Sequence, residues 1–293
     1  MLCELLLKNI QELGVWVHIK SLAYYFGQQM LAWIGASLSV GVSGDQLRAA
    51  LKLVHPEGSP APLIRIGGSS DGGYLVPDDL EGLSACFSPG VADSASFELG
   101  MAELGIRSHM ADYSIEQSPV SGDLFTFEKL FLATHNEEGA LIRLDDWINS
   151  NSLPTEDLIL QMDIEGDEWP ILADASSEVL SRFRIIVLEL HGLDTLLTDK
   201  VGLKIFETVM RKLTSHFSVV HLHENNYGRE LNYSGVIIPQ VIEMTLIRRD
   251  RTKVGQRVYA SRIPHPLDAP NNPGGRDLGL SNDWTGNGVT RTS

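Results

Sequence analysis

The sequence predicts an α/β protein built on a doubly wound, mostly parallel sheet. From residue 83 onward, short apolar runs of strand length alternate with stretches of helical spacing, a pattern typical of βαβ units. Two of these runs, 158–162 and 185–190, end abruptly in ionisable residues, as buried strands do where they reach the edge of a parallel sheet. The 293 residues are 43% hydrophobic, which is enough to build a sizeable core.

The chain divides into three regions. Residues 1–55 are expected to form an N-terminal helical extension, in which residues 44–54 have helical spacing behind Asp45 as a cap. Residues 63–250 hold the alternating pattern and form the expected main domain. Residues 264–293 contain four prolines and five glycines but few apolar residues, so we expect a disordered or loosely packed tail.

The N-terminal region contains an uncharged stretch, residues 21–44, that is long enough to cross a bilayer. Glutamines, serines and glycines dilute its hydrophobicity, so we expect a helix that packs on the domain. A peripheral membrane contact through residues 1–45 is the second alternative, and a membrane span is the third. The whole chain contains only two cysteines, too few in practice for a disulfide framework or a cysteine zinc site. The reducing cytoplasm is therefore the simplest compartment to assign to the protein.

The expected elements follow from the periodicity of the sequence. The apolar runs are 83–87, 106–110, 158–162, 185–190, 219–222 and 241–247, and the helical stretches between them include 97–104, 169–180 and 201–213. Ahead of the first run, residues 63–76 hold glycines and serines around Asp71. This composition suggests a loop whose backbone approaches a ligand closely, with Asp71, Gly73 and Tyr74 as candidate cofactor-binding residues.

A turn at Ser88-Pro-Gly90 follows the first run, and a helix is expected to begin near residue 94. Backbone N–H groups at the start of that helix could face a ligand. The second run ends at Asp112, about twenty residues after Gly90, which is the spacing at which an acid reaches a ribose hydroxyl. Ser88, Gly90 and Asp112 are therefore candidate cofactor-binding residues. Because this turn has a single glycine, we do not expect a pyrophosphate to lie over it, and this argues against NAD or FAD as the cofactor.

The run 158–162 is followed by Asp163-Ile-Glu-Gly, whose two acids point to the same side in an extended chain. Acids in this position can hold a divalent metal, face a cationic ligand or act as a base. The alternative is that an acid here caps the helix expected to begin at Trp169. The candidate roles include catalysis and cofactor contact for Asp163, and metal binding for Asp163 together with Glu189.

Histidines end two further runs. Glu189-Leu-His191 closes one run, and His221-Leu-His223 belongs to the next, where a period of two puts both histidines on one face. His191 and His223 are candidate catalytic residues at a polar site shared with the neighbouring acids. Unconnected loop residues are the alternative.

The order of these pieces resembles the FkbM-type methyltransferases. The matching segments lie within residues 63–250, and the Asp-Ile-Glu-Gly piece is the most specific; the others are Arg65-Ile-Gly-Gly, Asp71-Gly-Gly-Tyr-Leu, Ser88-Pro-Gly, Asp112-Tyr-Ser-Ile, Val187-Leu-Glu-Leu-His and His221-Leu-His-Glu-Asn-Asn-Tyr-Gly. The chain departs from the family at the first turn, where Ser88 and Pro89 replace the usual glycine-rich form.

The resemblance implies an S-adenosylmethionine-dependent enzyme with the class I Rossmann-like fold, a seven-stranded and mostly parallel sheet. It also implies O-methylation of a sugar or another small hydroxylated molecule. By position, Gly90 and its neighbours would hold the amino-acid part of the cofactor, Asp112 its ribose, and Asp163 would stand beside the sulfonium and the acceptor.

The residues suit this chemistry in two ways. Methyl transfer needs alignment, and an alcohol must also lose its proton, which a histidine could accept. A divalent ion such as Mg²⁺ held by carboxylates could instead acidify the hydroxyl. The partner is then a small-molecule or glycan acceptor, and the net charge of −15 argues against nucleic acid. An NAD-dependent oxidoreductase and a binding module without turnover are the competing functions.

Overall fold

The computed structural model describes residues 41–252, 259, 262–276 and 279–286. Most of the region expected to pack or touch a membrane, residues 1–45, lies outside these residues, so those expectations stay predictions. Among the described residues, no helix is both long and apolar enough to cross a membrane.

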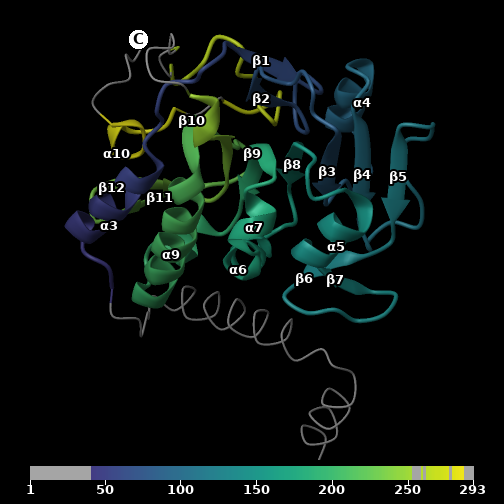
Figure 1. The fold of residues 1–293 in the computed structure, drawn as a ribbon. Coiled ribbons are helices and arrows are strands. Elements are labelled where there is room, and N and C mark those ends of the chain that lie inside the picture. The colour runs from purple at the N-terminus through teal and green to yellow at the C-terminus, as the bar shows by residue number, and fades with distance from the viewer. Residues whose placement is uncertain (1–40, 253–258, 260–261, 277–278, 287–293) are drawn as a thin grey trace, which may run out of the picture. The chain divides into compact units, whose positions relative to one another are not determined.

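A seven-stranded sheet in the order β10-β13-β9-β8-β3-β4-β5 forms the centre of the domain (Figure 1). All neighbouring strands pair in parallel except β13, which is antiparallel to both β9 and β10. Its strands are β3 (Ala85–Pro89), β4 (Arg107–Ala111), β5 (Phe125–Glu128), β8 (Leu158–Met162), β9 (Phe183–Leu190), β10 (Phe217–Glu224) and β13 (Ile242–Arg248).

This connectivity identifies the fold. Counted in chain order, the seven strands lie as 3-2-1-4-5-7-6, with the last strand inserted antiparallel between the fifth and sixth. That is the topology of the class I methyltransferase Rossmann-like fold, so the predicted fold class is confirmed. The strand order reverses between β3 and β8, and ligands of open α/β sheets bind in the crevice at such a switch point, outside the carboxyl ends of the strands.

Helices cover both faces of the sheet. The longer ones are α3 (Gly44–Leu51), α4 (Ser96–Glu103), α5 (Leu144–Asn151), α6 (Glu168–Asp174) and α9 (Lys200–His216). The short ones are α7 (Ser177–Leu180), α8 (Leu193–Leu196), α10 (Asn282–Thr285), η1 (Lys52–Val54) and η2 (Arg249–Arg251). Three small hairpins or ladders complete the domain: β1 (Leu63–Ile66) with β2 (Tyr74–Pro77), β6 (Phe131–Ala133) with β7 (Leu141–Arg143), and β11 (Glu230–Tyr233) with β12 (Val236–Pro239).

Strand β8 shows how the sheet separates two cores. Leu158, Leu160 and Met162 join the cluster packed beneath α3, α5, α6 and α9, whereas Ile159 joins the cluster beneath α4 and the β1–β2 hairpin. Successive side chains of a strand point to opposite faces, so a strand covered on both sides is mostly apolar, as β8 is apart from Gln161. The continuous apolar run in the sequence therefore marks the centre of the sheet.

The ends of the domain differ from the sequence prediction. Contacts place Gly41 onward in one compact unit, and Leu47 and Leu51 of α3 are fully buried in the main core, so residues 44–54 are part of the domain and not an extension. Leu280 and Trp284 belong to the same core, and Trp284 Nε1 donates to the Ile237 carbonyl at 2.8 Å. Leu280 and Trp284 are thus anchored to the core, and the disordered or loosely packed tail of residues 264–293 stays a prediction.

Candidate active site

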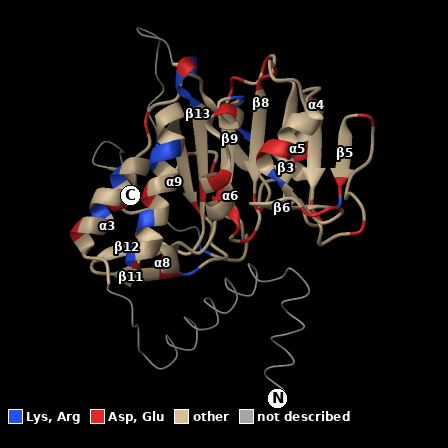
Figure 2. Ribbon diagram, turned by 60° about the horizontal axis from the view of Figure 1, so that its bottom comes forward, with Lys and Arg blue, Asp and Glu red and all other residues tan. Residues whose placement is uncertain are grey.

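Ionisable side chains form a row across the carboxyl edge of the sheet. Asp163 directly follows β8, and Glu189 lies near the end of the neighbouring β9. The register continues the row, because Glu189 pairs with Glu243 on β13 and Glu243 pairs with His223 on β10. Figure 2 shows acidic residues gathered near the arrowheads of β3, β4 and β5, whereas the basic segment beyond β13 lies at the opposite edge.

Three members of this group converge on one point. Ligand-type atoms of Asp163, Glu189 and His191 all lie within 4.8 Å of one another. The Nε2 atom of His191 is 3.9 Å from Asp163 Oδ1, 3.7 Å from Glu189 Oε1 and 3.5 Å from Glu165 Oε2. These separations exceed the usual 2.7–3.2 Å of an N–H···O hydrogen bond. The sequence-based expectation that these strand ends meet is confirmed for these residues.

Glu168, at the start of α6, fixes the local geometry. This fully buried carboxylate accepts hydrogen bonds from the backbone N–H groups of Ile164 at 3.1 Å and Gly166 at 3.2 Å, and it lies 3.1 Å from His191 Nδ1. It therefore ties the turn after β8 to the imidazole and orients the ring. No motif in the sequence marks Glu168 as a site residue, because an acid in the first turn of a helix usually interacts favourably with the helix dipole.

The side chains around His191 perturb one another. Burial raises the pKa of the Asp163 carboxyl to about 7, with His191 opposing and Glu165 adding to the shift. Burial alone would lower the pKa of the His191 imidazole, but the hydrogen bond with Glu168 and the nearby carboxylates outweigh it and raise that pKa to about 9. Burial also raises the pKa of Glu189 well above its ordinary range, and Asp163 and Glu243 add to this. The site thus favours positive charge.

The two central carboxylates differ in their hydrogen bonds. Glu189 accepts from Asn225 Nδ2 at 2.6 Å and from the Tyr74 hydroxyl at 3.1 Å. Asp163 Oδ1 is buried and has no hydrogen-bond partner among the residues that the structure describes. Buried polar atoms in native proteins almost always have a partner, so an orphaned carboxylate oxygen at the switch point indicates a place where a ligand supplies it.

The turn after β3 approaches Asp163 very closely. Gly90 has a φ of +88°, and a Cβ placed there would lie 1.5 Å from the Asp163 carbonyl oxygen. The glycine is thus required first by the packing of the turn against the end of β8. Ser88 is fully buried and donates to Gln161 Oε1 at 2.5 Å, and it also contacts Glu98. The Ser88 hydroxyl therefore holds the turn through these two side chains, and the role of Ser88 in cofactor binding stays a prediction.

The loop formed by residues 67–73 lies beside this turn, since the Ser96 hydroxyl of α4 donates to the Gly72 carbonyl at 2.8 Å. A Cβ at Gly73 would lie 2.0 Å from the Gly68 carbonyl oxygen, so the loop closes on itself too tightly for any other residue. Asp71 accepts from Asn271 Nδ2 at 3.2 Å, and the same amide donates to Glu243 at 2.5 Å. Asn271 comes from the C-terminal segment, which the sequence analysis left out of the site.

Asp112 lies at the end of β4 and connects two loops. Its Oδ2 accepts from the Ala92 N–H at 2.8 Å, and its Oδ1 accepts from the N–H and the hydroxyl of Ser114, both at 2.7 Å. Beyond it, the partly exposed rings of Tyr113 and Phe131 stack at a tilt with 5.3 Å between their centroids. Asp112 thus holds the strand-end loops at the position expected for a ribose.

The histidines of β10 lie away from His191. His223 Nδ1 is 3.1 Å from Glu243 Oε2, and His221 Nε2 is 2.9 Å from Asp268 Oδ1. Strand β13 separates β10 from β9, and because neighbouring strands lie about 4.8 Å apart, His223 is roughly 10 Å from the strand that carries Glu189. The three histidines predicted to share one site therefore divide into two groups.

Comparisons with known proteins add little to this picture. No family model and no curated protein sequence matches the chain. One solved structure that is similar, a Pyrococcus horikoshii protein described as a candidate RNA methyltransferase, has 12% sequence identity and a TM-score of 0.33, and the match covers 69% of this chain and 98% of that one. So low a score decides nothing, and the fold assignment stands on the strand order.

Proposed function

We propose that this chain is an S-adenosylmethionine-dependent O-methyltransferase that acts on a sugar or another small hydroxylated acceptor. The observation that carries the proposal is the buried, unpaired Oδ1 of Asp163 at the switch point of a class I methyltransferase topology. The ordered motifs that resemble the FkbM-type family support the finer assignment to oxygen acceptors.

The charge of the rim supports this cofactor over a dinucleotide. Asp112, Asp163 and Glu189 present carboxylates at the ends of three strands. Carboxylates attract the sulfonium and ammonium groups of S-adenosylmethionine and accept hydrogen bonds from ribose hydroxyls, whereas they repel a pyrophosphate. The same carboxylates can accept hydrogen bonds from a polyhydroxylated acceptor.

The proposed roles follow the geometry. Asp112 would bind the ribose hydroxyls while it holds the loop at Ala92, and backbone N–H groups after Gly90 would face the amino-acid part of the cofactor. Asp163 would stand beside the sulfonium. When bound, the cofactor supplies a methyl group carried on positively charged sulfur.

The acceptor hydroxyl would sit at His191, and two routes can activate it. An imidazole at this point can take the proton, provided that the arrival of a positive charge first lowers its raised pKa. Alternatively, a divalent ion can hold and acidify the hydroxyl. His223, across β13, fits the far side of the acceptor pocket better than the proton transfer itself.

Two measurements test the proposal. Calorimetry with S-adenosylhomocysteine and with NAD should give binding of the first ligand only. A screen of sugars and other hydroxylated molecules with labelled S-adenosylmethionine should then give a labelled, base-stable ether. Binding of NAD alone would favour an oxidoreductase, and binding of S-adenosylhomocysteine without turnover on a broad acceptor panel would favour a binding module.

A further inference from the structure

We infer that Asp163, Glu189 and His191 form a binding site for one first-row divalent metal ion. Ion binding stands independently of the proposed methyl transfer, whereas the role suggested below for the ion rests on that function.

The spacing of the donor atoms suits a single ion. The three residues offer two carboxylate oxygens and one imidazole nitrogen within 4.8 Å of one another. Ligand atoms bound to one ion at about 2.0–2.2 Å lie roughly 3–4 Å apart. His191 Nε2 lies 3.9 Å from Asp163 and 3.7 Å from Glu189, which is too long for hydrogen bonds but within this range.

The surrounding residues orient the donors as they do in known metal centres. A histidine that binds a metal through one ring nitrogen almost always donates the other N–H to a carboxylate, carbonyl or water. Here His191 Nδ1 is 3.1 Å from the buried Glu168, which leaves Nε2 directed at Asp163 and Glu189. Glu189 is held in turn by Asn225 at 2.6 Å and by Tyr74 at 3.1 Å.

Two further observations fit a bound cation. Asp163 Oδ1 is buried without a hydrogen-bond partner in the described part of the chain, and it is the atom that faces His191 Nε2. The carboxylates of Asp163, Glu165, Glu168 and Glu189 surround one imidazole. A divalent ion would satisfy the orphaned oxygen and relieve the repulsion among these carboxylates.

The donor set narrows the choice of metal. Carboxylates and water suit Mg²⁺ and Mn²⁺, whereas an imidazole ligand favours first-row transition metals, so Mn²⁺ or a later ion fits better than Mg²⁺. Three protein ligands leave open positions for an acceptor hydroxyl. Coordination would lower the pKa of that hydroxyl, and the O–H proton could pass to Glu165, whose largely exposed carboxylate is 3.5 Å from His191 Nε2.

The test uses the full chain, freed of metal by chelation and desalting. Titration with Mn²⁺, followed by the EPR signal of the free ion, should show about one ion per chain. The ion should bind about 100-fold more weakly or not at all to His191→Ala and Asp163→Asn, and about 10–100-fold more weakly to Glu168→Gln. His135→Ala, at an exposed histidine, is the matched control and should bind as wild type does. Circular dichroism checks that each variant folds.

The outcomes separate this inference from the proposed function. Wild-type affinity in folded His191→Ala, or substoichiometric binding to the wild type, would overturn the metal site. Binding of S-adenosylhomocysteine together with full turnover after exhaustive chelation would overturn the role of the ion in activating the acceptor and leave the methyltransferase intact. One bound ion, lost in His191→Ala, in a protein that fails to bind S-adenosylhomocysteine would uphold the metal site and refute the methyltransferase.

Discussion

The two edges of the central sheet use charged residues in opposite ways. At the amino edge, arginines and aspartates pair closely: Asp157 is 2.7 Å from both Arg184 and Arg248, and Asp79 is 2.7 Å from Arg251. At the carboxyl edge, carboxylates outnumber cations, and Asp163 Oδ1 has no partner. Paired charge holds a structure together, whereas unpaired buried charge is retained only where a ligand or a reaction uses it.

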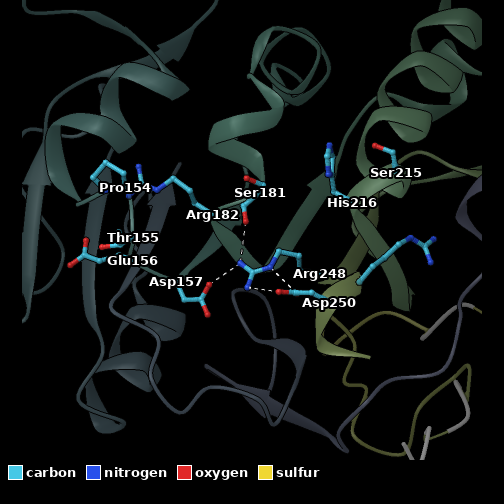
Figure 3. A pocket seen from close by; sticks show the side chains of 11 residues that line it. Pro154, Thr155, Glu156, Asp157, Ser181, Arg182, Ser215, His216, Arg248 and Asp250 are labelled. Carbon is cyan, nitrogen blue, oxygen red and sulfur yellow. Dashed lines mark hydrogen bonds and ion pairs between the residues drawn. The ribbon is translucent and has the colours of Figure 1, made fainter. Parts of the chain in front are cut away.

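A pocket of about 550 Å³ lies at the amino edge (Figure 3). It is lined by residues 154–157, 181–182, 215–216 and 248–250. Arg248 spans it, bound to Asp157, Asp250 and the Ser181 carbonyl. Arg248 is thus neutralised by two aspartates and is not available to bind an anion in this pocket.

The largest effect is expected at the amino edge, on stability. Arg184 is 5% exposed and binds Asp157 as well as the carbonyls of Asp79 and Glu81. Replacing Arg184 with alanine removes one of the two arginines paired with Asp157 and the donor to the Asp79 and Glu81 carbonyls, so we expect the free energy of unfolding to fall by about 3 kcal/mol. Urea denaturation measures this. Affinity for S-adenosylhomocysteine in the folded variant should not change, and a loss of affinity would break the division between the two edges.

At the carboxyl edge, His191→Ala should act on turnover. If the imidazole activates the acceptor, as a base or as a metal ligand, kcat should fall about 10²-fold or more. Affinity for S-adenosylhomocysteine should stay within a few-fold of wild type, because the cofactor is proposed to bind toward Asp112 and Gly90. Steady-state kinetics measures kcat, and calorimetry on the same preparation measures the affinity for S-adenosylhomocysteine. If His223→Ala loses more activity than His191→Ala, the reacting centre lies at β10 and not at His191.

Asp112→Ala should weaken S-adenosylmethionine binding by about tenfold or more, since a carboxylate that accepts ribose hydroxyls contributes roughly 1.5–3 kcal/mol. The same carboxylate also holds Ala92 and Ser114. Ser114→Ala is therefore the informative control, because it removes one hydroxyl donor and keeps the carboxylate. Equal losses of affinity in the two variants would mean that Asp112 acts by ordering the loops and does not bind ribose.

The smallest and most diagnostic contrast is in the dependence of stability on pH. Burial alone would raise the pKa of the Asp157 carboxyl. The hydrogen bonds with Arg248 and Arg184 outweigh burial and lower this pKa below its usual value. Asp157 thus stabilises the fold above pH ~4, and this contribution is lost as the pH falls through the folded-state pKa. Burial raises the pKa of Asp163 to about 7, so this residue destabilises the metal-free fold progressively as the pH rises from about 4 through 7.

At pH 8, Asp157→Asn should therefore lower the Tm of the metal-free protein, whereas Asp163→Asn should raise it. The Asp163→Asn difference should shrink as the pH falls from about 7 toward 4, whereas the Asp157→Asn difference should persist at pH 4 and shrink only as the pH falls further. Thermal unfolding at several pH values checks the signs. A lower Tm for Asp163→Asn at pH 8 would show that this carboxylate is a structural partner, and the contrast between the edges would fail.

Several elements follow from the sequence alone, with a physical reason. Strand β8 coincides with the predicted run 158–162, and β9 and β10 contain theirs, because a strand covered on both faces is mostly apolar along its length. Ionisable residues directly after such a run must lie at the sheet edge. The meeting of Asp163 with His191 could thus be predicted without coordinates.

Other features depended on contacts between segments far apart in the chain. Strand β5 at the sheet edge is partly exposed and leaves no apolar run, so its sequence gave no signal. The insertion of β13 between β9 and β10 brings Glu243 beside Glu189 and removes His223 from His191. No local pattern encodes such a pairing, because it depends on which edges remain free once the other strands have packed.

The sequence by itself determined the alternating architecture and the ionisable ends of its central strands, because periodicity records the burial of each element. Tertiary structure alone decided which of those groups are satisfied. Glu168 reaches His191 across 23 residues, Asn271 reaches Asp71 across 200, and Asp163 Oδ1 reaches nothing. Whether a charged side chain serves stability or function depends on its partners, and partners are set by the folded chain.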